Sequence, residues 1–599
     1  MFGQQPWPAT ASRMMIADMP SFRTLVVPTI ALSICLQIPC LLTVAGDATV
    51  HLAVADKFAH GQPFEYNGHG DIVVASTSPF WTLMLTGFLQ MSMRNAPVLL
   101  KITCLLFFVL VAFLLNDLAS RHWKLSDPAR WGLLALWLTS PTILVNTLGG
   151  MENVITAFQL LLLYTLLRRP LLDSSLRYRL GIGMLLGWAL LTRPDTAFFS
   201  GLLVLCSLVP ELWGRKSPRA VIQGLAHLLV VAGMALAIVA PWFAFQYAQV
   251  GQLVTDSSVA RLLVGRRTSI MIGGGLYYHP RLFLVLTIAF APIAAGVLVA
   301  AARLVRDVYR APGRFLVDRE WVWRSGAPMI LVLCGFAFYS FVFGALHAGR
   351  YFLPLLPYFF YLGIRTADEL LPRLPSAARL AIVAASVAYL FSVSAYDYSR
   401  RLQDETLAFN LPAIMAAPFN REQFTDRLLT DLGVPGSRSV KFAVTEVQIR
   451  YLLDDRVEIL SLDGRSSGLV LTFADRRTGI PDFPRYLEAT HPDFLELGQW
   501  CTPYTGLQYY LIPAPKASNL LCDWERRVSK MHPGEGFEWK GRWVQVVQPG
   551  IVQITWSAPD VARLVLPARE QHWDCGRRGT VCIFGAKGLG NPSLESVEM

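Results

Sequence analysis

The sequence predicts an α-helical polytopic membrane domain followed by a C-terminal mixed α/β domain outside the cytoplasm. Of the 599 residues, 53% are hydrophobic and only 16% are charged, and the mean hydropathy is +0.42. Long uncharged runs recur as far as residue 398, after which turns and strand-like alternation such as WVQVVQPGIVQITW begin. We therefore expect a membrane domain over residues 1–398 and a soluble domain over residues 399–599.

The uncharged runs are the expected membrane spans. Those long enough, or almost long enough, to cross a bilayer lie at 24–45, 97–115, 131–148, 153–167, 180–192, 196–210, 221–247, 282–302, 327–346, 351–364 and 380–396. They predict about eleven transmembrane helices. The segment Pro79–Met93 is apolar too, but its 15 residues are marginal for a crossing. We expect a re-entrant or interfacial helix there.

Basic residues predict the orientation, because arginine and lysine concentrate in cytoplasmic connections. They cluster at 121–130, 168–179, 215–219, 303–324 and 365–379. If these connections are cytoplasmic, the N-terminus is inside, while the first external loop (46–96) and the C-terminal domain are outside. The net charge of +11 lies largely in these connections, so no nucleic acid is expected as a partner.

Cysteine usage also favours an exterior C-terminal domain. Four of the nine cysteines lie in it, namely Cys501, Cys522, Cys575 and Cys582. An even number is typical of disulfides in an oxidising compartment. The most local pairing is Cys501–Cys522 and Cys575–Cys582, although the sequence does not fix the connectivity. No metal-finger spacing is present.

The first long polar interruption, Gly46–Trp81, follows the first apolar run directly. If its first part is helical, Asp47 and His51 lie one turn apart on one face. Val54 and Phe58 belong to a separate apolar stripe, which favours a short helix lying on the membrane surface. A carboxylate at a membrane boundary needs a water-filled cavity or a partner. We therefore expect Asp47 at the start of a surface helix.

The other external connections carry polar groups as well. The candidates are Glu152 in the second, Arg193 and Asp195 in the third, Asp256 and Arg261 in the fourth, and His347, Arg350 and Tyr351 in the fifth. Arginine binds phosphate with a planar fork, and a carboxylate can accept a hydroxyl proton. Gathered on one membrane face, these groups suit an anionic lipid-linked substrate. Taken singly, an acid at the end of a span is more often structural, and Arg193 and Asp195 can simply pair with each other.

Read in order, these residues resemble the GT-C class of polytopic membrane glycosyltransferases, in the branch with the mycobacterial terminal β-arabinofuranosyltransferase. The matching stretches are GDATVHLAVADKFAHG from Gly46, then Tyr66–Gly68 (YNG), Ser76–Thr82 (STSPFWT), Gly150–Asn153 (GMEN), Thr192–Asp195 (TRPD) and Arg350–Pro354 (RYFLP). The likeness covers nearly the whole chain. Gly46 replaces the first acid of the family's usual pair, and Asp256 stands where an asparagine is common.

The resemblance implies an inverting, polyprenyl-phosphate-sugar-dependent glycosyltransferase of the bacterial inner membrane, with its C-terminal domain in the periplasm. The sugar, arabinofuranose or another pentose or hexose, would pass to a hydroxyl of a cell-envelope glycan, glycolipid or glycoprotein. Asp47 would be the catalytic base, with Glu152 as its rival. The implied substrate-binding residues are His51, Arg193, Asp195, Asp256, Arg261, His347, Arg350 and Tyr351. A divalent cation stays open as a cofactor.

Two other functions remain open. A transporter or flippase of lipid-linked sugars would show inverted repeats or helices broken at matching places, and the sequence shows neither. An oligosaccharide ligase would use a diphosphate-linked polymer as its donor, and the sequence does not exclude it.

Overall fold

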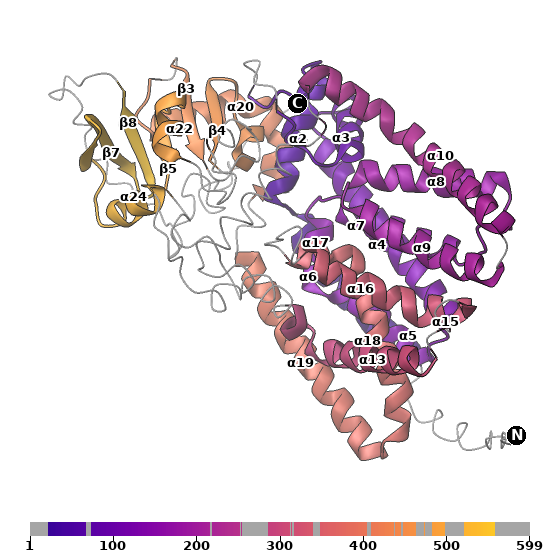
Figure 1. Ribbon diagram of the computed structural model, residues 1–599. Coiled ribbons are helices and arrows are strands. Elements are labelled where there is room, and N and C mark those ends of the chain that lie inside the picture. Colours follow the sequence, from indigo (N-terminus) through magenta and orange to yellow (C-terminus); the bar gives the residue numbers. More distant parts are fainter. Residues whose placement is uncertain are drawn as a thin grey trace, which may run out of the picture.

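The chain is mostly helical, with a sheet near its C-terminal end. The computed structural model describes residues 22–67, 73–215, 218–251, 286–311, 317–339, 348–403, 409–435, 438–444, 447–462, 482–497 and 520–556, with the single positions 253, 255, 313 and 473. Figure 1 shows the helices packed side by side and the sheet at one end of the molecule. A helical part followed by a mixed α/β part is the predicted order, and this prediction is confirmed.

The helices are named as in Figure 1. Those of the first part are α1 (Phe22–Leu41), α2 (Gly46–Ala59), α3 (Pro79–Met91), α4 (Ala96–Asp117), α5 (Asp127–Thr139), α6 (Pro141–Leu148), α7 (Asn153–Leu167), α8 (Leu176–Thr192), α9 (Thr196–Arg215), α10 (Pro218–Val250), α13 (Ala291–Arg310), α15 (Arg319–Trp321), α16 (Ala327–Ala337), α17 (Ala348–Phe352), α18 (Leu356–Leu370) and α19 (Ser376–Gln403). Those of the second part are α20 (Leu411–Asp431), α22 (Phe483–Thr490) and α24 (Leu520–Val528).

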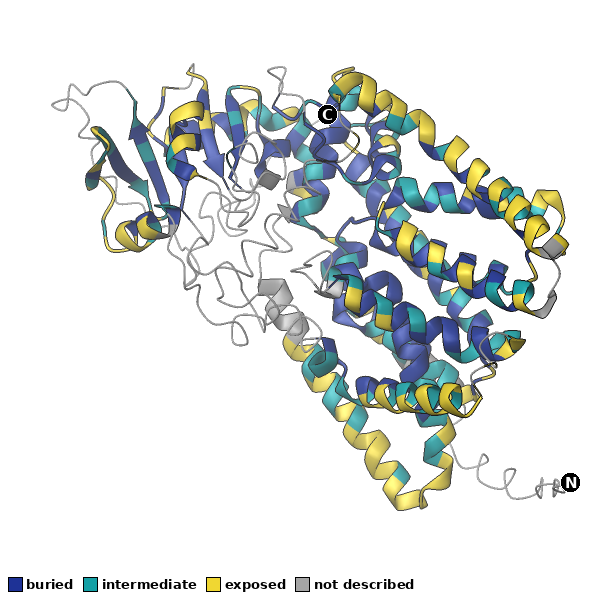
Figure 2. Ribbon diagram, viewed as in Figure 1, coloured by how far each residue is buried: buried dark blue, intermediate teal, exposed yellow. Residues whose placement is uncertain are grey.

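Fewer helices qualify as complete spans than the sequence predicts. Among the described residues, four are long and apolar enough to cross a membrane: Ala96–His122, Thr196–Trp213, Val221–Val250 and Ser376–Tyr396. A fifth results if α5 and α6, which are bent by 49°, count as one span. The bend lies at Ser140, whose extended backbone precedes Pro141. The count of about eleven is therefore not confirmed. Figure 2 shows that α19 is largely exposed over Ser376–Tyr396, which suits a lipid-facing helix.

Helix α3 occupies the apolar segment that is too short to span. Its 13 residues reach about 20 Å at 1.5 Å per residue, against a hydrocarbon layer of about 30 Å. Pro79 takes the first helical position, where its fixed φ favours a helix start. Trp81, Leu85 and Leu89 are buried, and α3 contacts α2, α4 and α8. This geometry fits the predicted re-entrant or interfacial helix.

Glycines set the close packing of α8 on α10. A Cβ atom on Gly183 would lie 2.6 Å from the carbonyl oxygen of Val231, and one on Gly187 would lie 2.7 Å from Cβ of Ile238. Small residues four positions apart let membrane helices approach each other in this way. A larger side chain at either position would push α10 away from α8.

The main sheet has the strand order β4–β3–β5–β8–β7–β6. The strands are β1 (Thr43–Val44), β2 (Phe409–Asn410), β3 (Val440–Val444), β4 (Val457–Ser461), β5 (Phe494–Glu496), β6 (Gly536–Trp539), β7 (Arg542–Gln548) and β8 (Ile551–Thr555). Strands β4, β3 and β5 are parallel, whereas β8, β7 and β6 form an antiparallel meander. The alternating stretch WVQVVQPGIVQITW forms the β7–β8 hairpin, which turns at Gly550 with φ +77°.

The two faces of this sheet pack on different partners, because side chains alternate along a strand. Ala443 and Leu460 belong to a small core with residues of α22 and α24. Phe442 and Ile459, their neighbours on the same strands, join the buried core that continues through the helical part. The sheet is therefore not a separate globule, and its inner face shares a core with the helices.

Asn67 fastens residues 46–96, the predicted first external loop, to the sheet. Its amide donates to the carbonyl oxygen of Ile459 and accepts from the amide nitrogen of the same residue, both at 3.0 Å. The side chain thus pairs with the edge of β4 as a further strand would. Arg450 holds the same loop, since its guanidinium donates to the carbonyl oxygens of Tyr66 (3.0 Å) and Asn67 (3.2 Å).

Further contacts join the loop to the second part of the chain. Strand β1 pairs antiparallel with β2, so the residues just before α2 are held by the residues just before α20. Asp56 lies 2.8 Å from Arg421, and Lys57 lies 3.1 Å from Asp455. Helix α2 is therefore fixed between the helical part and the sheet.

Replacing Asn67 with alanine should loosen this attachment. Two backbone groups of β4 would lose their partner in a buried place, which costs roughly 1–3 kcal/mol for each unsatisfied group. Hydrogen exchange at the amide of Ile459 should speed up in Asn67→Ala. Gln62→Ala, which changes an exposed residue of the same loop, is the control. Equal exchange in both variants would contradict the attachment.

Two predictions lie outside the described residues. The side chains of Cys501, Cys522, Cys575 and Cys582 are among those not described, so the disulfides remain a prediction. No disulfide joins any two of the cysteines whose side chains the structure describes, which are Cys35, Cys40, Cys104, Cys206 and Cys334. The orientation of the termini across the membrane is likewise a prediction.

Candidate functional site

Charged side chains from four helix ends meet in one cluster. Asp47 lies in the first turn of α2, Glu152 directly precedes α7, Arg193 directly follows α8, and Arg350 lies in α17. They come from four separate external connections of the predicted topology. Folding therefore brings together groups that are far apart in the sequence, and it places them at the ends of helices.

Asp47 and Arg350 form the outer part of this cluster. Their carboxylate and guanidinium are in ion-pair contact across 303 residues of sequence. Both side chains keep some exposure, 22% for Asp47 and 14% for Arg350. Nε of Arg350 has no hydrogen-bond partner among the described residues. The pair is thus partly accessible, although the Nε atom of Arg350 is itself buried.

Arg193 is the centre of the buried part. Its Nη1 lies 3.0 Å from Glu152 Oε1 and donates to Asn153 Oδ1 at 2.6 Å. Its Nε and Nη2 bind both oxygens of Asp195, at 3.0 and 2.9 Å. Asp195 also accepts a hydrogen bond from Tyr339 at 2.9 Å. The guanidinium is therefore shared between two carboxylates and an amide. Arg193 and Asp195 pair with each other, which is the structural role that the sequence analysis set beside substrate binding.

The ring of Tyr351 lies beside both arginines. The centroid of the ring is 5.2 Å from Cζ of Arg193 and 5.8 Å from Cζ of Arg350. Such distances allow attraction between a cation and the ring face. Tyr351 thereby links the exposed ion pair to the buried one.

His51 connects the cluster to the segment before α3. Its Nε2 lies 3.6 Å from Glu152 Oε2, and its Nδ1 lies 3.1 Å from Ser76 Oγ. Burial lowers the pKa of His51, and the charges of Arg350 and Arg193 act in the same direction. Burial alone would raise the pKa of Glu152, but the charges of Arg193 and Arg350, together with that of His51 whenever it is protonated, outweigh burial and the pKa is lowered. We infer a neutral ring beside an ionised carboxylate.

The glycines of the Gly149–Gly150 pair explain how Glu152 reaches this position. The amide nitrogen of Ala45 donates to the carbonyl oxygen of Gly149 at 2.8 Å, just before α2 begins. Gly150 has φ +98°, and a Cβ there would lie 2.9 Å from Leu100 Cδ2 and 3.2 Å from Ala48 Cβ. Only glycine allows both the backbone angle and this approach. The two connections can therefore touch.

Gly150→Ala should destabilise the protein by about 1–3 kcal/mol, because it combines an unfavourable φ with a steric clash. Its unfolding midpoint in detergent should fall. Gly181→Ala is the control, since Gly181 lies in α8 with nothing within 4 Å of the added Cβ, and alanine favours a helix. An unchanged midpoint in Gly150→Ala would show that the backbone relaxes at no cost.

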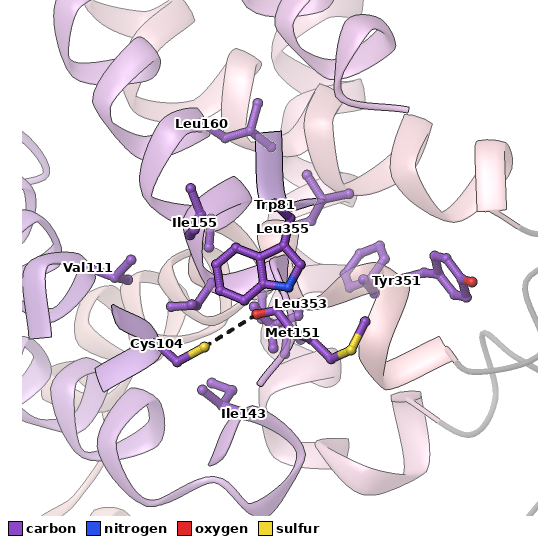
Figure 3. Close-up of a cluster of buried hydrophobic side chains, with 14 of the residues drawn as sticks. Trp81, Cys104, Val111, Ile143, Met151, Ile155, Leu160, Tyr351, Leu353 and Leu355 are labelled. Atoms are coloured by element: carbon purple, nitrogen blue, oxygen red, sulfur yellow. Dashed lines mark hydrogen bonds between the residues drawn. The ribbon is translucent and has the colours of Figure 1, made fainter. Parts of the chain in front are cut away.

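Lys101, from α4, supports the contact between the connection before α2 and the connection before α7. It does so from the buried side. Its ammonium group donates to the carbonyl oxygens of Cys40, Thr43 and Leu148. The oxygens of Cys40 and Leu148 lie in the last turns of α1 and α6, where carbonyl groups lack helical partners. Thr43 belongs to β1. Next to them, an apolar core closes off the cluster. Figure 3 shows Trp81 surrounded by apolar side chains that include Met151, Leu353 and Leu355.

The structure brings most of the predicted residues together. Those in the cluster are Asp47, His51, Glu152, Arg193, Asp195, Arg350 and Tyr351. Asp256, Arg261 and His347 lie outside the described residues. Sequence reasoning missed Ser76, Asn153 and Tyr339 as members. The first two stand in the STSPFWT and GMEN stretches, which is the signal that could have found them, whereas Tyr339 stands in an ordinary apolar run.

The side chains of this cluster can accept a proton and can bind an anion. A partly exposed carboxylate can accept a proton, and a partly exposed guanidinium can bind a phosphate. Within the part of the chain that is described, no group of three or more His, Cys, Asp or Glu side chains is placed to hold a metal ion.

Comparisons with known proteins give distant likenesses. No protein-family model matches the chain, and no curated protein does. Among solved structures, ArnT from Cupriavidus metallidurans bound to undecaprenyl phosphate is 14% identical, with a TM-score of 0.49, over 80% of this chain and 94% of that chain. The Archaeoglobus fulgidus oligosaccharyltransferase in complex with Zn and sulfate is 13% identical, with a TM-score of 0.41, over 78% of this chain and 68% of that chain. At TM-scores below 0.5 these likenesses decide neither fold nor activity, and the mycobacterial branch remains a prediction.

Proposed function

We propose that this chain is an inverting glycosyltransferase that moves a sugar from a polyprenyl phosphate to an acceptor hydroxyl at the outer face of a bacterial inner membrane. The observation that carries the proposal is the Asp47–Arg350 ion pair. It places a proton acceptor next to a phosphate-binding group at the accessible edge of a buried charge cluster. The acceptor would belong to a cell-envelope glycan, glycolipid or glycoprotein, and the resemblance favours arabinofuranose or another pentose or hexose.

Asp47 is the better base of the two predicted carboxylates. A base must reach the proton that it removes. The Asp47 side chain is 22% exposed, whereas that of Glu152 is 2% exposed and lies between Arg193 and His51. Glu152 therefore serves to hold Arg193 and His51 in place.

Arg350 is the better phosphate ligand of the two described arginines. Arg193 already has its donors directed at Glu152, Asn153 and Asp195. Among the described residues, Nε of Arg350 has no hydrogen-bond partner, and the ion-pair partner of Arg350 is Asp47, which the reaction itself would neutralise. Arg261 remains a further candidate from the resemblance.

The transfer then couples two charge changes. The acceptor oxygen bonds to the anomeric carbon of the sugar while its proton passes to Asp47. The bond between that carbon and the phosphate oxygen breaks, and its electron pair stays on the polyprenyl phosphate. The leaving group gains one negative charge as Asp47 loses one. Arg350 can therefore move its interaction from the carboxylate to the phosphate, and one displacement on the face opposite the phosphate inverts the configuration.

The position of the cluster bears on the competing functions. A transporter binds its cargo near the middle of the membrane, between broken helices. Here Asp47, Glu152, Arg193 and Arg350 all lie at helix ends. Helix ends also bind cargo in transporters, so the preference for transfer rests on the predicted topology, which puts all four connections on one membrane face. A ligase would use the same face, so the test below separates it by its product.

Mass analysis of surface glycans in a deletion strain tests the proposal. One type of sugar unit should be missing, and the wild-type gene should restore it while Asp47→Asn should not. Unchanged glycans would contradict the proposal. Loss of an entire polymer from its attachment point, with all its sugars intact, would identify a ligase instead.

A further inference from the structure

Ser76 Oγ lies at the meeting point of three hydrogen bonds. It accepts from the amide nitrogen of Ser78 at 3.2 Å and from Thr82 Oγ1 at 2.8 Å. The third contact joins it to Nδ1 of His51 at 3.1 Å. Ser76, Ser78, Thr82 and His51 are all buried, so the hydroxyl proton of Ser76 is expected to have a partner within the protein.

The number of protons decides the direction of the third bond. A serine hydroxyl has two acceptor lone pairs and one proton to donate. Here the lone pairs are filled by Ser78 and Thr82. The proton of Ser76 therefore points at Nδ1 of His51, which must be the unprotonated nitrogen. In a neutral imidazole the proton is then on Nε2.

The other side of the ring agrees with this assignment. Nε2 of His51 faces Oε2 of Glu152 at 3.6 Å. An ionised carboxylate only accepts hydrogen bonds, so a proton on Nε2 is favourable there. Glu152 Oε2 has no other partner among the described residues. The remaining charged groups near the ring are Asp47 at its own helix start, Arg350 and Arg193.

We propose that Ser76 is a positioning residue which fixes His51 as the neutral tautomer protonated on Nε2, so that His51 holds Glu152 against Arg193. Its effect on transfer rests on the proposed function, whereas the tautomer itself does not. Doubly protonated His51 would add a third cation beside Arg193 and Arg350. The Ser76–Thr82 stretch thereby gains a specific role, because it supplies both the donor to His51 and the hydroxyl that orients that donor.

The tautomer can be read directly by nitrogen NMR of the full-length protein. Val50–His51 is the only Val–His pair in the sequence, so labelling valine with carbonyl carbon-13 and histidine uniformly with carbon-13 and nitrogen-15 selects the backbone amide of His51 without a variant. The ring nitrogens of His51 are then reached through its labelled side-chain carbons. We expect a neutral ring at neutral pH, with Nδ1 unprotonated and Nε2 protonated. A proton on Nδ1, on one nitrogen or on both, would overturn the proposal. This measurement needs no donor, so it can fail while the transferase function holds.

Three serine variants test the consequence for transfer, measured as sugar restored to the glycans of the deletion strain. Ser76→Ala should lower transfer roughly tenfold, the rate equivalent of one net hydrogen bond. Ser76→Thr, which keeps a hydroxyl, should recover most of it. Ser78→Ala is the matched control, because its buried hydroxyl has no partner among the described residues and its amide is unchanged. Equal transfer in Ser76→Ala and Ser78→Ala would also overturn the proposal.

Discussion

Asp47→Asn should lower single-turnover sugar transfer by about a hundredfold or more, the range usual for loss of a positioned base. Asparagine keeps the shape of the side chain but cannot take up the proton of the acceptor hydroxyl. The lost ion pair with Arg350 is partly exposed, so the stability should change by only about 1 kcal/mol or less. Purified Asp47→Asn should therefore have a nearly normal unfolding midpoint and almost no activity.

Glu152→Gln is the matched comparison in the same assay. It removes the same charge from a buried site, where Arg193 and His51 depend on it. We expect its main effect to be on stability, with transfer reduced less than in Asp47→Asn when the folded protein is compared. Near-normal chemistry in Asp47→Asn together with an inactive but folded Glu152→Gln would show that Glu152 is the base.

Arg193→Met should destabilise the protein by about 3–5 kcal/mol, as expected when one partner of a buried ion pair is removed. Methionine fills a similar length but leaves Glu152 and Asp195 without their cation. Their side chains are 2% and 6% exposed, so water cannot replace the lost bonds. Arg121→Met is the control, since the Arg121–Asp117 pair is exposed at 77% and 37% and should be worth about 0–1 kcal/mol.

The pH dependence of the unfolding free energy gives a second test of the interaction between Arg193 and Glu152. The lowered pKa of Glu152 means that its contribution to stability is present above the unfolded value of about 4.3 and is lost as the pH falls through the folded value. Without Arg193, one of the charges that lower the pKa of Glu152 is lost and this pKa rises relative to wild type. The acid limb of the curve of unfolding free energy against pH should therefore move to higher pH in Arg193→Met. An acid limb unchanged from wild type would contradict the role of Arg193.

The sequence predicts the parts of this site better than their arrangement. Asp47 could be placed at the start of a helix because an apolar run ends just before it, and α2 begins at Gly46. The short helix at Pro79 followed from the length of its apolar run. The contact between Asp47 and Arg350 could not be predicted, because 303 residues separate them and no local pattern encodes which helix ends meet.

Three further structural features could not be predicted from the sequence. The fixed bend at Ser140–Pro141 divides a run that by hydropathy alone is one span. Asn67 stands in a stretch that resembles the family, yet its pairing with β4 depends on a strand 392 residues away. Ser76 looks like any loop serine until His51 and Thr82 are seen around it. For Asn67 and Ser76 the missing information is a contact between residues that are distant in the sequence.

The shared core of sheet and helices has a consequence for how the protein unfolds. Asn67, Arg421 and the inner face of the sheet tie residues of the first external loop to the C-terminal part. Cooperative units are defined by contacts and not by sequence order. Helix α2 with Asp47 should therefore open together with the sheet in native-state hydrogen exchange, as one sub-global unit that crosses the predicted boundary at residue 398.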